Sequence, residues 1–186
     1  MQNKKHKRLY TTKTVTTLGL LAALSVVIGW VCKSYLTFGP IRITFENIPI
    51  IISGIIYGPV IGAIVAVLSD IISCLTSPNP ALNPIITLGA ASIGIISGVV
   101  SKYVIKSGRF SVILKTLLSV FISHIIGSML IKSIGLHLFW GYEIPMLLWR
   151  IPLYLAISVC ESMIIFVILR NKSIASMLEK QMDRKG

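Results

Sequence analysis

The amino-acid sequence predicts an all-α membrane protein, a six-helix transmembrane bundle whose N- and C-termini are both cytoplasmic. The chain of 186 residues is 54% hydrophobic and only 13% charged, with a mean hydropathy of +0.85. Three runs carry no charged residue at all: 14–32, 47–69 and 71–101. A membrane-spanning helix needs about 20 apolar residues, so these runs have the composition and the length of bilayer crossings.

The positive charge of the chain also fits a membrane better than a nucleic acid. The net charge is +12, but Lys and Arg gather at both ends of the chain and in short loops. Basic residues that flank apolar runs are an orientation signal in membranes, whereas a nucleic-acid-binding domain gathers them on one folded surface. We therefore expect contact with membrane lipid and no nucleic-acid partner.

The first helix is predicted over residues 14–33, after a basic cytoplasmic tail at 1–13. Its N-terminal flank resembles a signal peptide, but the apolar run is long and no A-x-A cleavage site follows it. We expect a retained helix. A loop at 34–47 comes next, with a turn at Gly39-Pro40.

The apolar block at 48–75 is predicted to form two short helices. Tyr57-Gly58-Pro59 interrupts it, and proline cannot continue the hydrogen-bond ladder of a helix. The two helices are expected at 48–56 and 59–75. A proline-rich loop at 76–84, with Pro78 and Pro80, then leads to the second half of the chain.

The second half is predicted to hold three longer helices. Asn83-Pro84 is typical of an N-cap with proline at the first helical position. The expected order is a helix at 84–101, a basic loop at 102–109, a helix at 110–131, a loop containing Gly135, His137 and Trp140, a helix at 145–169 and a basic cytoplasmic tail at 171–186. The transmembrane domain is thus expected at 14–170.

The positions of the basic residues predict the orientation. With six crossings and a cytoplasmic N-terminus, 14 of the 18 Lys and Arg lie on the cytoplasmic side, as the positive-inside rule requires. The outer half keeps only Lys33, Arg42, Lys132 and Arg150. Merging the two short helices would invert every later loop and place the basic loop at 102–109 outside, so six crossings are favoured.

Small residues recur four apart and predict where helices pack closely. Such spacing lets helix backbones approach within a membrane. We expect packing within this chain for the central set: Gly54, Gly58, Gly62, Ala66, Ala90, Gly94 and Gly98. For Gly19 and Ala23 on the first helix, packing within the chain and packing against a partner subunit are equally favoured.

Ionisable residues inside a membrane are functional candidates, because each carries a desolvation cost. Asp70, Glu161 and Lys115 all fall within predicted helices. Glu161 and Lys115 lie at similar depths, so we predict an ion pair between them. His124 is expected to be a hydrogen-bonded interior histidine.

Motifs for catalysis, metal binding and ATP binding are missing from the sequence. There is no G-x-x-x-x-G-K-[ST], H-E-x-x-H or G-x-S-x-G motif. Cys32, Cys74 and Cys160 are too scattered for a metal or disulfide pattern. We therefore predict no metal, no cofactor and no enzymatic activity, and energy must come from a partner.

The four outer basic residues predict a ligand site, because orientation does not explain them. Lys33 and Lys132 are interpreted as helix ends whose side chains reach the interface. Arg42 and Arg150 suit a carboxylate, which a guanidinium binds bidentately. Three helix N-termini and many aromatic residues belong to the same side. Together these features predict an outward-facing pocket for a flat, anionic, partly aromatic small molecule.

Several motifs resemble one transporter family. They are Arg42-Ile-Thr-Phe-Glu-Asn-Ile-Pro-Ile-Ile, Ser53-Gly-Ile-Ile-Tyr-Gly-Pro, the helix with Asp70, Asn83-Pro-Ile-Ile-Thr-Leu-Gly, and Arg150-Ile-Pro. Over about residues 14–169 the chain is similar to the substrate-binding S component of energy-coupling factor (ECF) transporters, and within these to the folate family.

The resemblance implies a six-helix protein of the bacterial cell membrane that binds a vitamin on its extracellular side. Its partners would be a transmembrane coupling protein and two ATPase subunits. Gly19-x-x-x-Ala23 is the nearest match to the family's A-x-x-x-A docking motif. On the folate hypothesis Arg42 and Arg150 hold carboxylates or the pterin edge, Asn83 and Glu46 offer hydrogen bonds, and Trp149 stacks. The expected substrate-binding set also includes Phe45, Asn47 and Asp70.

Other functions stay open at this point. The ligand could be another vitamin or the precursor of a modified base. A small membrane enzyme acting on lipid head groups would have only Asp70, His124 and Glu161 to use, at different depths. A structural assembly factor without a ligand would leave the outer arginines unexplained.

Overall fold

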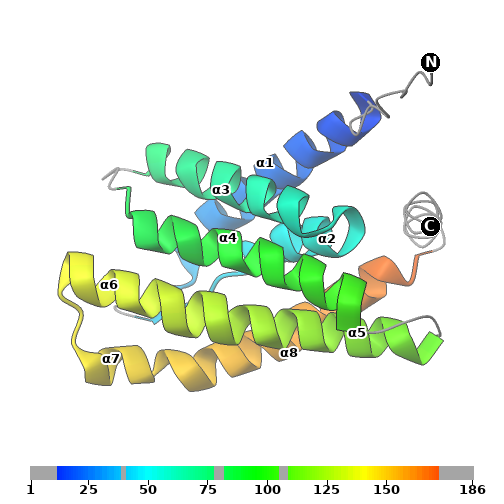
Figure 1. Cartoon of the computed structure of the whole chain (residues 1–186). Coiled ribbons are helices and arrows are strands. Elements are labelled where there is room, and N and C mark those ends of the chain that lie inside the picture. Colours follow the sequence, from blue (N-terminus) through cyan, green and yellow to red (C-terminus); the bar gives the residue numbers. More distant parts are fainter. Residues whose placement is uncertain (1–11, 39–40, 78–81, 105–108, 172–186) are drawn as a thin grey trace, which may run out of the picture.

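The computed structural model describes residues 12–38, 41–77, 82–104 and 109–171, and its helices pack side by side as one bundle (Figure 1). Six helical segments are found in these ranges, some of them built from several elements. The elements are α1 (Thr12–Tyr35), β1 (Thr37–Phe38), β2 (Ile41–Arg42), α2 (Asn47–Tyr57), α3 (Pro59–Leu75), α4 (Pro84–Val99), the π-helix η1 (Val100–Val104), α5 (Arg109–Ser123), the π-helix η2 (His124–Ile131), α6 (Lys132–Trp140), α7 (Ile144–Leu148) and α8 (Arg150–Leu169).

The predicted break between the second and third helices is confirmed. Gly58 has a φ of 97°, a backbone conformation that favours glycine, and Pro59 opens α3. The chain reverses at this point, so α2 and α3 are separate antiparallel segments (Figure 1). The number of segments is therefore even, and the start of α1 and the end of α8 lie at the same end of the bundle.

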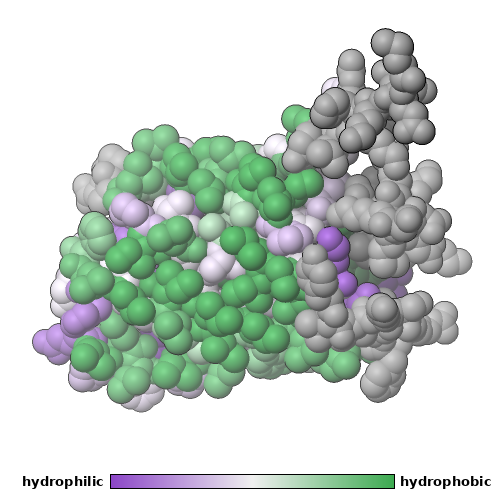
Figure 2. Space-filling model, in the orientation of Figure 1, coloured by the Kyte–Doolittle hydropathy of each residue, from purple (hydrophilic) through white to green (hydrophobic). Residues whose placement is uncertain are grey.

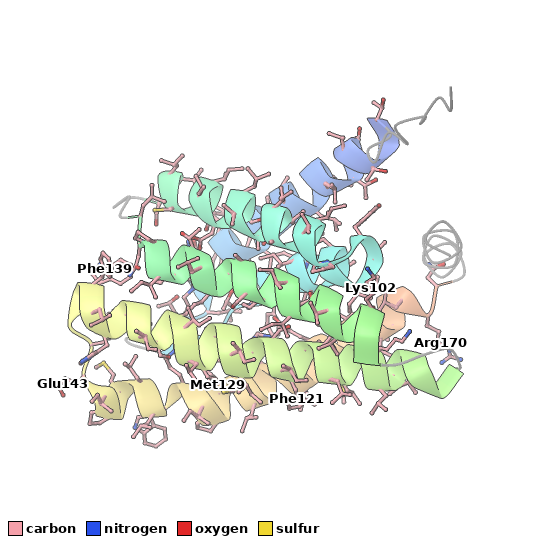
Figure 3. All side chains as sticks on the ribbon, in the orientation of Figure 1. Lys102, Phe121, Met129, Phe139, Glu143 and Arg170 are labelled. Atoms are coloured by element: carbon pink, nitrogen blue, oxygen red, sulfur yellow. The ribbon has the colours of Figure 1, made fainter. Side chains whose placement is uncertain are left out.

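Four segments are long and apolar enough to cross a membrane: residues 14–35, 84–102, 113–140 and 144–169. The apolar helices α2 and α3 are shorter. Hydrophobic side chains cover the broad face shown in Figure 2. In Figure 3, Phe121 and Met129 lie along this face, while Lys102 and Arg170 lie at one end of the bundle and Glu143 at the other. This distribution is that of an all-helical membrane protein.

Two features differ from the sequence prediction. The loop after α1 contains a small antiparallel hairpin, in which Thr37 of β1 pairs with Arg42 of β2. The fifth segment does not end near residue 131 but runs on to Trp140, where Gly141 with a φ of 65° ends it. Gly135 lies inside this helix, where a Cβ would be 3.1 Å from Ile86 Cγ1, so this glycine permits close packing on α4 and does not make a turn.

The predicted close packing of the central helices is confirmed. A Cβ on Gly62 of α3 would lie 2.5 Å from the carbonyl oxygen of Gly94 on α4 and 2.8 Å from Gly54 Cα on α2. The backbones of the three helices are thus in direct contact, as small residues allow in a membrane. Ile51, Ala66 and Ile93 are fully buried in the core around this contact.

The predicted basic tails and three loop features lie wholly or largely outside the described residues. These are the tails at 1–13 and 171–186, the turn at Gly39-Pro40, the prolines Pro78 and Pro80, and the central part of the basic loop at 102–109.

Candidate functional site

A cavity of about 400 Å³ lies within the bundle, toward the end that holds the hairpin and the α6–α7 connection. Ligand sites in proteins commonly enclose ~300–1,000 Å³, so the cavity can hold a small molecule. Its walls come from α1, α2, α3, α4, α6, α7 and α8 together with the hairpin loop. It lies away from the end where α1 begins and α8 ends.

Most of the sequence-predicted site residues line this cavity. Six of the eight do so: Arg42, Glu46, Asn47, Asp70, Asn83 and Arg150. Phe45 packs instead against the hydrophobic core. Trp149 is 69% exposed and does not line the cavity.

Helix geometry explains why Arg150 and Trp149 have different surroundings. Consecutive residues of a helix point about 100° apart, whereas residues three and four apart share a face. The cavity-lining residues of this last segment are Met146, Leu147, Arg150, Leu153 and Tyr154, which follow that spacing. Trp149 lies beside this face, so the expectation that it stacks on a ligand does not fit the geometry.

Two lysines that the sequence assigned to helix ends also line the cavity. Lys33 Nζ donates a hydrogen bond to Ser73 Oγ at 2.7 Å, which joins α1 to α3. Lys132 is only 8% exposed and its Nζ lies 3.9 Å from Glu46 Oε1. The interpretation of Lys132 as a helix end is wrong because α6 continues for eight residues beyond it. In the sequence, only one observation set these two lysines apart: they fall on the predicted outer side, where the positive-inside rule does not account for them.

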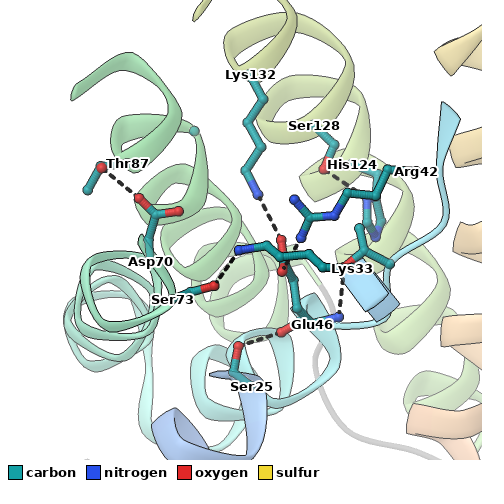
Figure 4. A network of polar contacts seen from close by, with 12 residues as sticks. Ser25, Lys33, Arg42, Glu46, Asp70, Ser73, Thr87, His124, Ser128 and Lys132 are labelled. Atoms are coloured by element: carbon teal, nitrogen blue, oxygen red, sulfur yellow. Dashed lines mark hydrogen bonds and ion pairs between the residues drawn. The ribbon is translucent and has the colours of Figure 1, made fainter. Parts of the chain in front are cut away.

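The cavity therefore has an excess of positive charge. Four cationic side chains line it, namely Lys33, Arg42, Lys132 and Arg150, against the two carboxylates Glu46 and Asp70. Figure 4 shows Arg42, Lys132 and Lys33 around the Glu46 carboxylate. The excess of two positive charges can balance an anion that carries two negative charges.

Glu46 lies at the centre of the cationic group. Its Oε2 accepts a hydrogen bond from Arg42 at 2.8 Å, and its backbone carbonyl accepts one from Ser25 Oγ at 2.7 Å. A Cβ on Gly29 of α1 would lie 2.6 Å from Glu46 Oε2, so the carboxylate packs closely against α1 at this glycine. Burial opposes ionisation of the carboxyl, but Arg42, Lys132 and Lys33 outweigh it and hold the pKa of Glu46 below its usual range.

The lowered pKa of Glu46 predicts how its contribution to stability depends on pH. A carboxylate with a lowered folded-state pKa stabilises the protein above its unfolded pKa, and loses that effect as the pH falls through the folded value. The difference in unfolding temperature between the wild type and Glu46→Gln should therefore be constant from pH 8 to 5 and shrink below about pH 4. Thermal unfolding in detergent across this range measures it. A difference that already disappears near pH 6 would contradict the assignment.

Asp70 and Asn83 form one wall through α3 and α4. Thr87 Oγ1 donates to Asp70 Oδ2 at 2.6 Å. Asn83 caps α4 as predicted, because its Oδ1 accepts from the backbone N–H groups of Ile85 and Ile86. Its Nδ2 also donates to the carbonyl of Gly135 at 3.0 Å. The amide of Asn83 is thus engaged within the protein.

Two polar groups of the cavity wall are buried without a partner. Asn47 is 1% exposed, and neither its Nδ2 nor its Oδ1 has a hydrogen-bond partner among the described residues. The same holds for Nε of Arg42. Buried polar atoms are nearly always hydrogen-bonded, and leaving one unpaired costs ~1–3 kcal/mol. A donor and an acceptor of Asn47 and a donor of Arg42 therefore have unused hydrogen-bonding capacity next to the cavity.

Arg150 lines the cavity from the start of α8, where it contacts Tyr154. The guanidinium donates to Tyr154 Oη at 3.2 Å, and its Cζ lies 5.2 Å from the centre of the same ring. Tyr154 is 5% exposed and lines the cavity one helical turn below Arg150. This contact leaves other guanidinium donors of Arg150 available.

The predicted ion pair between Glu161 and Lys115 is wrong. Glu161 Oε2 instead lies 2.6 Å from His124 Nε2, and both residues are fully buried. Lys115 is nine residues before His124, or about 14 Å along the helix, and its side chain is half-buried. Depth alone cannot identify the partner, because it says nothing of the face on which a residue lies. His124 is a hydrogen-bonded interior histidine, as expected.

Comparison with known proteins places the whole helical region in one family. Residues 13–177 match the family model described as ECF transporter, substrate-specific component. The chain belongs to this family. The comparison with curated proteins found no match at the threshold applied.

A solved structure supports the same assignment of this substrate-specific component. It is the crystal structure of FolT bound with folic acid, which shares 25% sequence identity with this chain and has a TM-score of 0.57. The alignment covers 91% of this chain and 92% of the FolT chain. The chain is thus similar to FolT over nearly its whole length.

The substrate-specific component is a transporter subunit. The structure also gives no support to the alternative of a membrane enzyme acting on lipid head groups. His124 and Glu161 are both fully buried. They do not line the cavity, whereas Asp70 does. The three residues that a lipid-modifying enzyme would need are therefore not brought together around one accessible space.

Proposed function

We propose that this chain is the folate-binding subunit of an ECF-type importer in a bacterial cell membrane. It captures folate or a reduced folate in the cavity and delivers it through a transmembrane coupling protein driven by two ATPase subunits. The observation that carries this proposal is a cavity within the bundle lined by four cations and two carboxylates. The similarity to FolT bound with folic acid supports the ligand class.

The chemistry of folic acid matches the groups in the cavity. Its glutamate moiety carries two carboxylates, which suit Arg42 and Arg150 as bidentate partners and Lys33 and Lys132 as point charges. Its pterin ring offers neighbouring donors and acceptors at its edge. The unpaired amide of Asn47 can both donate and accept there, with Glu46 or Asp70 as a further acceptor.

Aromatic contact with the ligand is assigned to residues other than Trp149. Trp140, Tyr142 and Tyr154 line the cavity. An aromatic ring favours offset-stacked or edge-to-face contact with another flat ring. These three side chains therefore replace Trp149 as candidates for packing against the pterin or the aminobenzoyl ring.

The membrane orientation follows from the cavity and the basic residues together. A capture subunit must open to the outside, so the end with the hairpin and the α6–α7 connection is extracellular in this proposal. The start of α1 and the end of α8 are then cytoplasmic, and the basic segments 1–13 and 171–186 are cytoplasmic tails. This orientation agrees with the positive-inside rule.

The face of α1 that carries Gly19 and Ala23 is proposed as the docking surface for the coupling protein. Both residues are exposed, and a Cβ on Gly19 would meet nothing within 4 Å. Neither residue is therefore buried against another of the described segments. The small side chains would let a partner helix approach closely.

Purification of the protein from its host, followed by identification of any retained small molecule, tests the proposed ligand. We expect folate or a reduced folate to be retained, and the emptied protein to bind folic acid as measured by isothermal titration calorimetry. Retention of another vitamin or a modified-base precursor would keep the capture role but replace the ligand. A protein that neither retains nor binds any such compound would contradict the capture role.

A further inference from the structure

A chain of side-chain contacts, two of them polar and one between two rings, runs from the buried interior of the bundle to the cavity. Glu161 of α8 pairs with His124 of η2 at 2.6 Å. The ring of His124 packs on that of Tyr154, with centroids 5.6 Å apart and planes at 34°. Tyr154 in turn contacts Arg150 through its hydroxyl and its ring. Arg150, at the end of this chain of contacts, is one of the cations that line the proposed binding site.

The buried end of this chain of contacts is costly for a membrane protein. Both His124 and Glu161 are fully buried, and Oε1 of Glu161 has no hydrogen-bond partner among the described residues. A buried pair of this kind is seldom more stabilising than apolar side chains of the same shape, and ionisable residues inside a membrane point to function. A contribution to the stability of the fold therefore does not explain well why His124 and Glu161 are paired here.

The local backbone keeps His124 in one place. His124 begins the π-helix η2, and its Nδ1 lies 3.1 Å from Oγ of Ser128, one turn later in the same element. Short π-helical stretches occur frequently at functional sites. With Glu161 on one ring nitrogen and Ser128 on the other, the imidazole plane is fixed from both sides.

Arg150 depends on this support more than Arg42 does. Arg42 is held by an ion pair with Glu46 at 2.8 Å. In the part of the chain that the structure describes, no carboxylate forms such a pair with Arg150, whose guanidinium contacts the hydroxyl and the ring of Tyr154. Arg150 thus contacts the Tyr154 side chain, and the ring of Tyr154 packs on His124.

We propose that His124 and Glu161 are positioning residues for ligand binding, which fix the Tyr154 ring and thereby hold Arg150 toward the anionic part of the ligand. This inference rests on the proposed function. Holding a flexible side chain in its bound conformation before the ligand arrives improves affinity, because less freedom is lost on binding. The pair would then act on the ligand without touching it.

A double-mutant cycle between Glu161→Gln and Arg150→Ala tests the proposal. Glutamine keeps the shape of Glu161 but removes its charge. With folic acid as the probe, Glu161→Gln should weaken binding about tenfold in the wild-type background and less than about twofold when Arg150 is already alanine, since interacting residues are non-additive. His124→Gln is the second variant, to be used in the same cycle if Glu161→Gln does not fold.

Ser119→Ala is the matched control. Ser119 is also fully buried and lies on the same helical segment, where it bonds to the Ser97 carbonyl and does not contact Arg150. It should leave folic-acid affinity unchanged. Equal factors in the two Arg150 backgrounds, or unchanged affinity in the single variant, would overturn the positioning role. A wild-type protein that fails to bind folic acid would instead overturn the proposed function, and this inference with it.

Discussion

Replacement of Arg42 or Arg150 by alanine is expected to weaken folic-acid binding by about thirtyfold or more, since loss of a buried charge-paired contact costs ~2–5 kcal/mol. Both side chains line the cavity, Arg42 from the hairpin and Arg150 from the start of α8. Each removal leaves a ligand carboxylate or pterin edge enclosed without its partner. Isothermal titration calorimetry on the purified protein measures the change in affinity.

Arg170→Ala is the matched control for Arg150→Ala. Arg170 ends the same helix α8 at its opposite end and its side chain is exposed. Its replacement removes the same charge far from the cavity, so the affinity for folic acid should not change. If Arg42→Ala and Arg150→Ala both left the affinity untouched, the cavity assignment would be wrong. Equal weakening by all three variants would indicate long-range attraction without specific contact.

The sequence could predict much of the fold because the signals there are local. Proline after glycine interrupts a helix whatever surrounds it, and the break at Gly58 is where expected. The N-cap at Asn83 is equally local. The end of the fifth segment is not set by a local signal, because the sequence does not distinguish Gly135, which lies within the helix, from Gly141, which ends it. Gly135 packs closely against Ile86 within the helix, whereas Gly141 ends it, and only the structure shows this difference.

The candidate site was predictable in its residue types but not in its pairings. Charges that orientation did not explain identified Arg42 and Arg150 as candidates, and the same argument applied to Lys33 and Lys132. The misplaced helix end made Lys132 look like a terminal residue. The partner of Glu161 depends on which face of α8 meets η2, which hydropathy does not encode.

Replacement of Gly62 by alanine is expected to destabilise the protein, although alanine favours a helix over glycine by ~1 kcal/mol. The added Cβ would lie 2.5 Å from the Gly94 carbonyl oxygen and 2.8 Å from Gly54 Cα, and both are backbone atoms that cannot move alone. Overpacking of this kind costs ~1–3 kcal/mol, and this site belongs at the upper end. The unfolding temperature in detergent should therefore fall by about 5 °C or more.

Gly19→Ala separates this steric effect from helix propensity, because it makes the same chemical change where nothing lies within 4 Å of the new Cβ. Its unfolding temperature should stay level or rise. If both variants were stabilised, α2, α3 and α4 would not be in backbone contact, and the cavity wall that α3 and α4 form would need another explanation. Opposite signs at the two glycines would show that Gly62 serves the bundle itself, while the face of α1 around Gly19 is left free for a partner subunit.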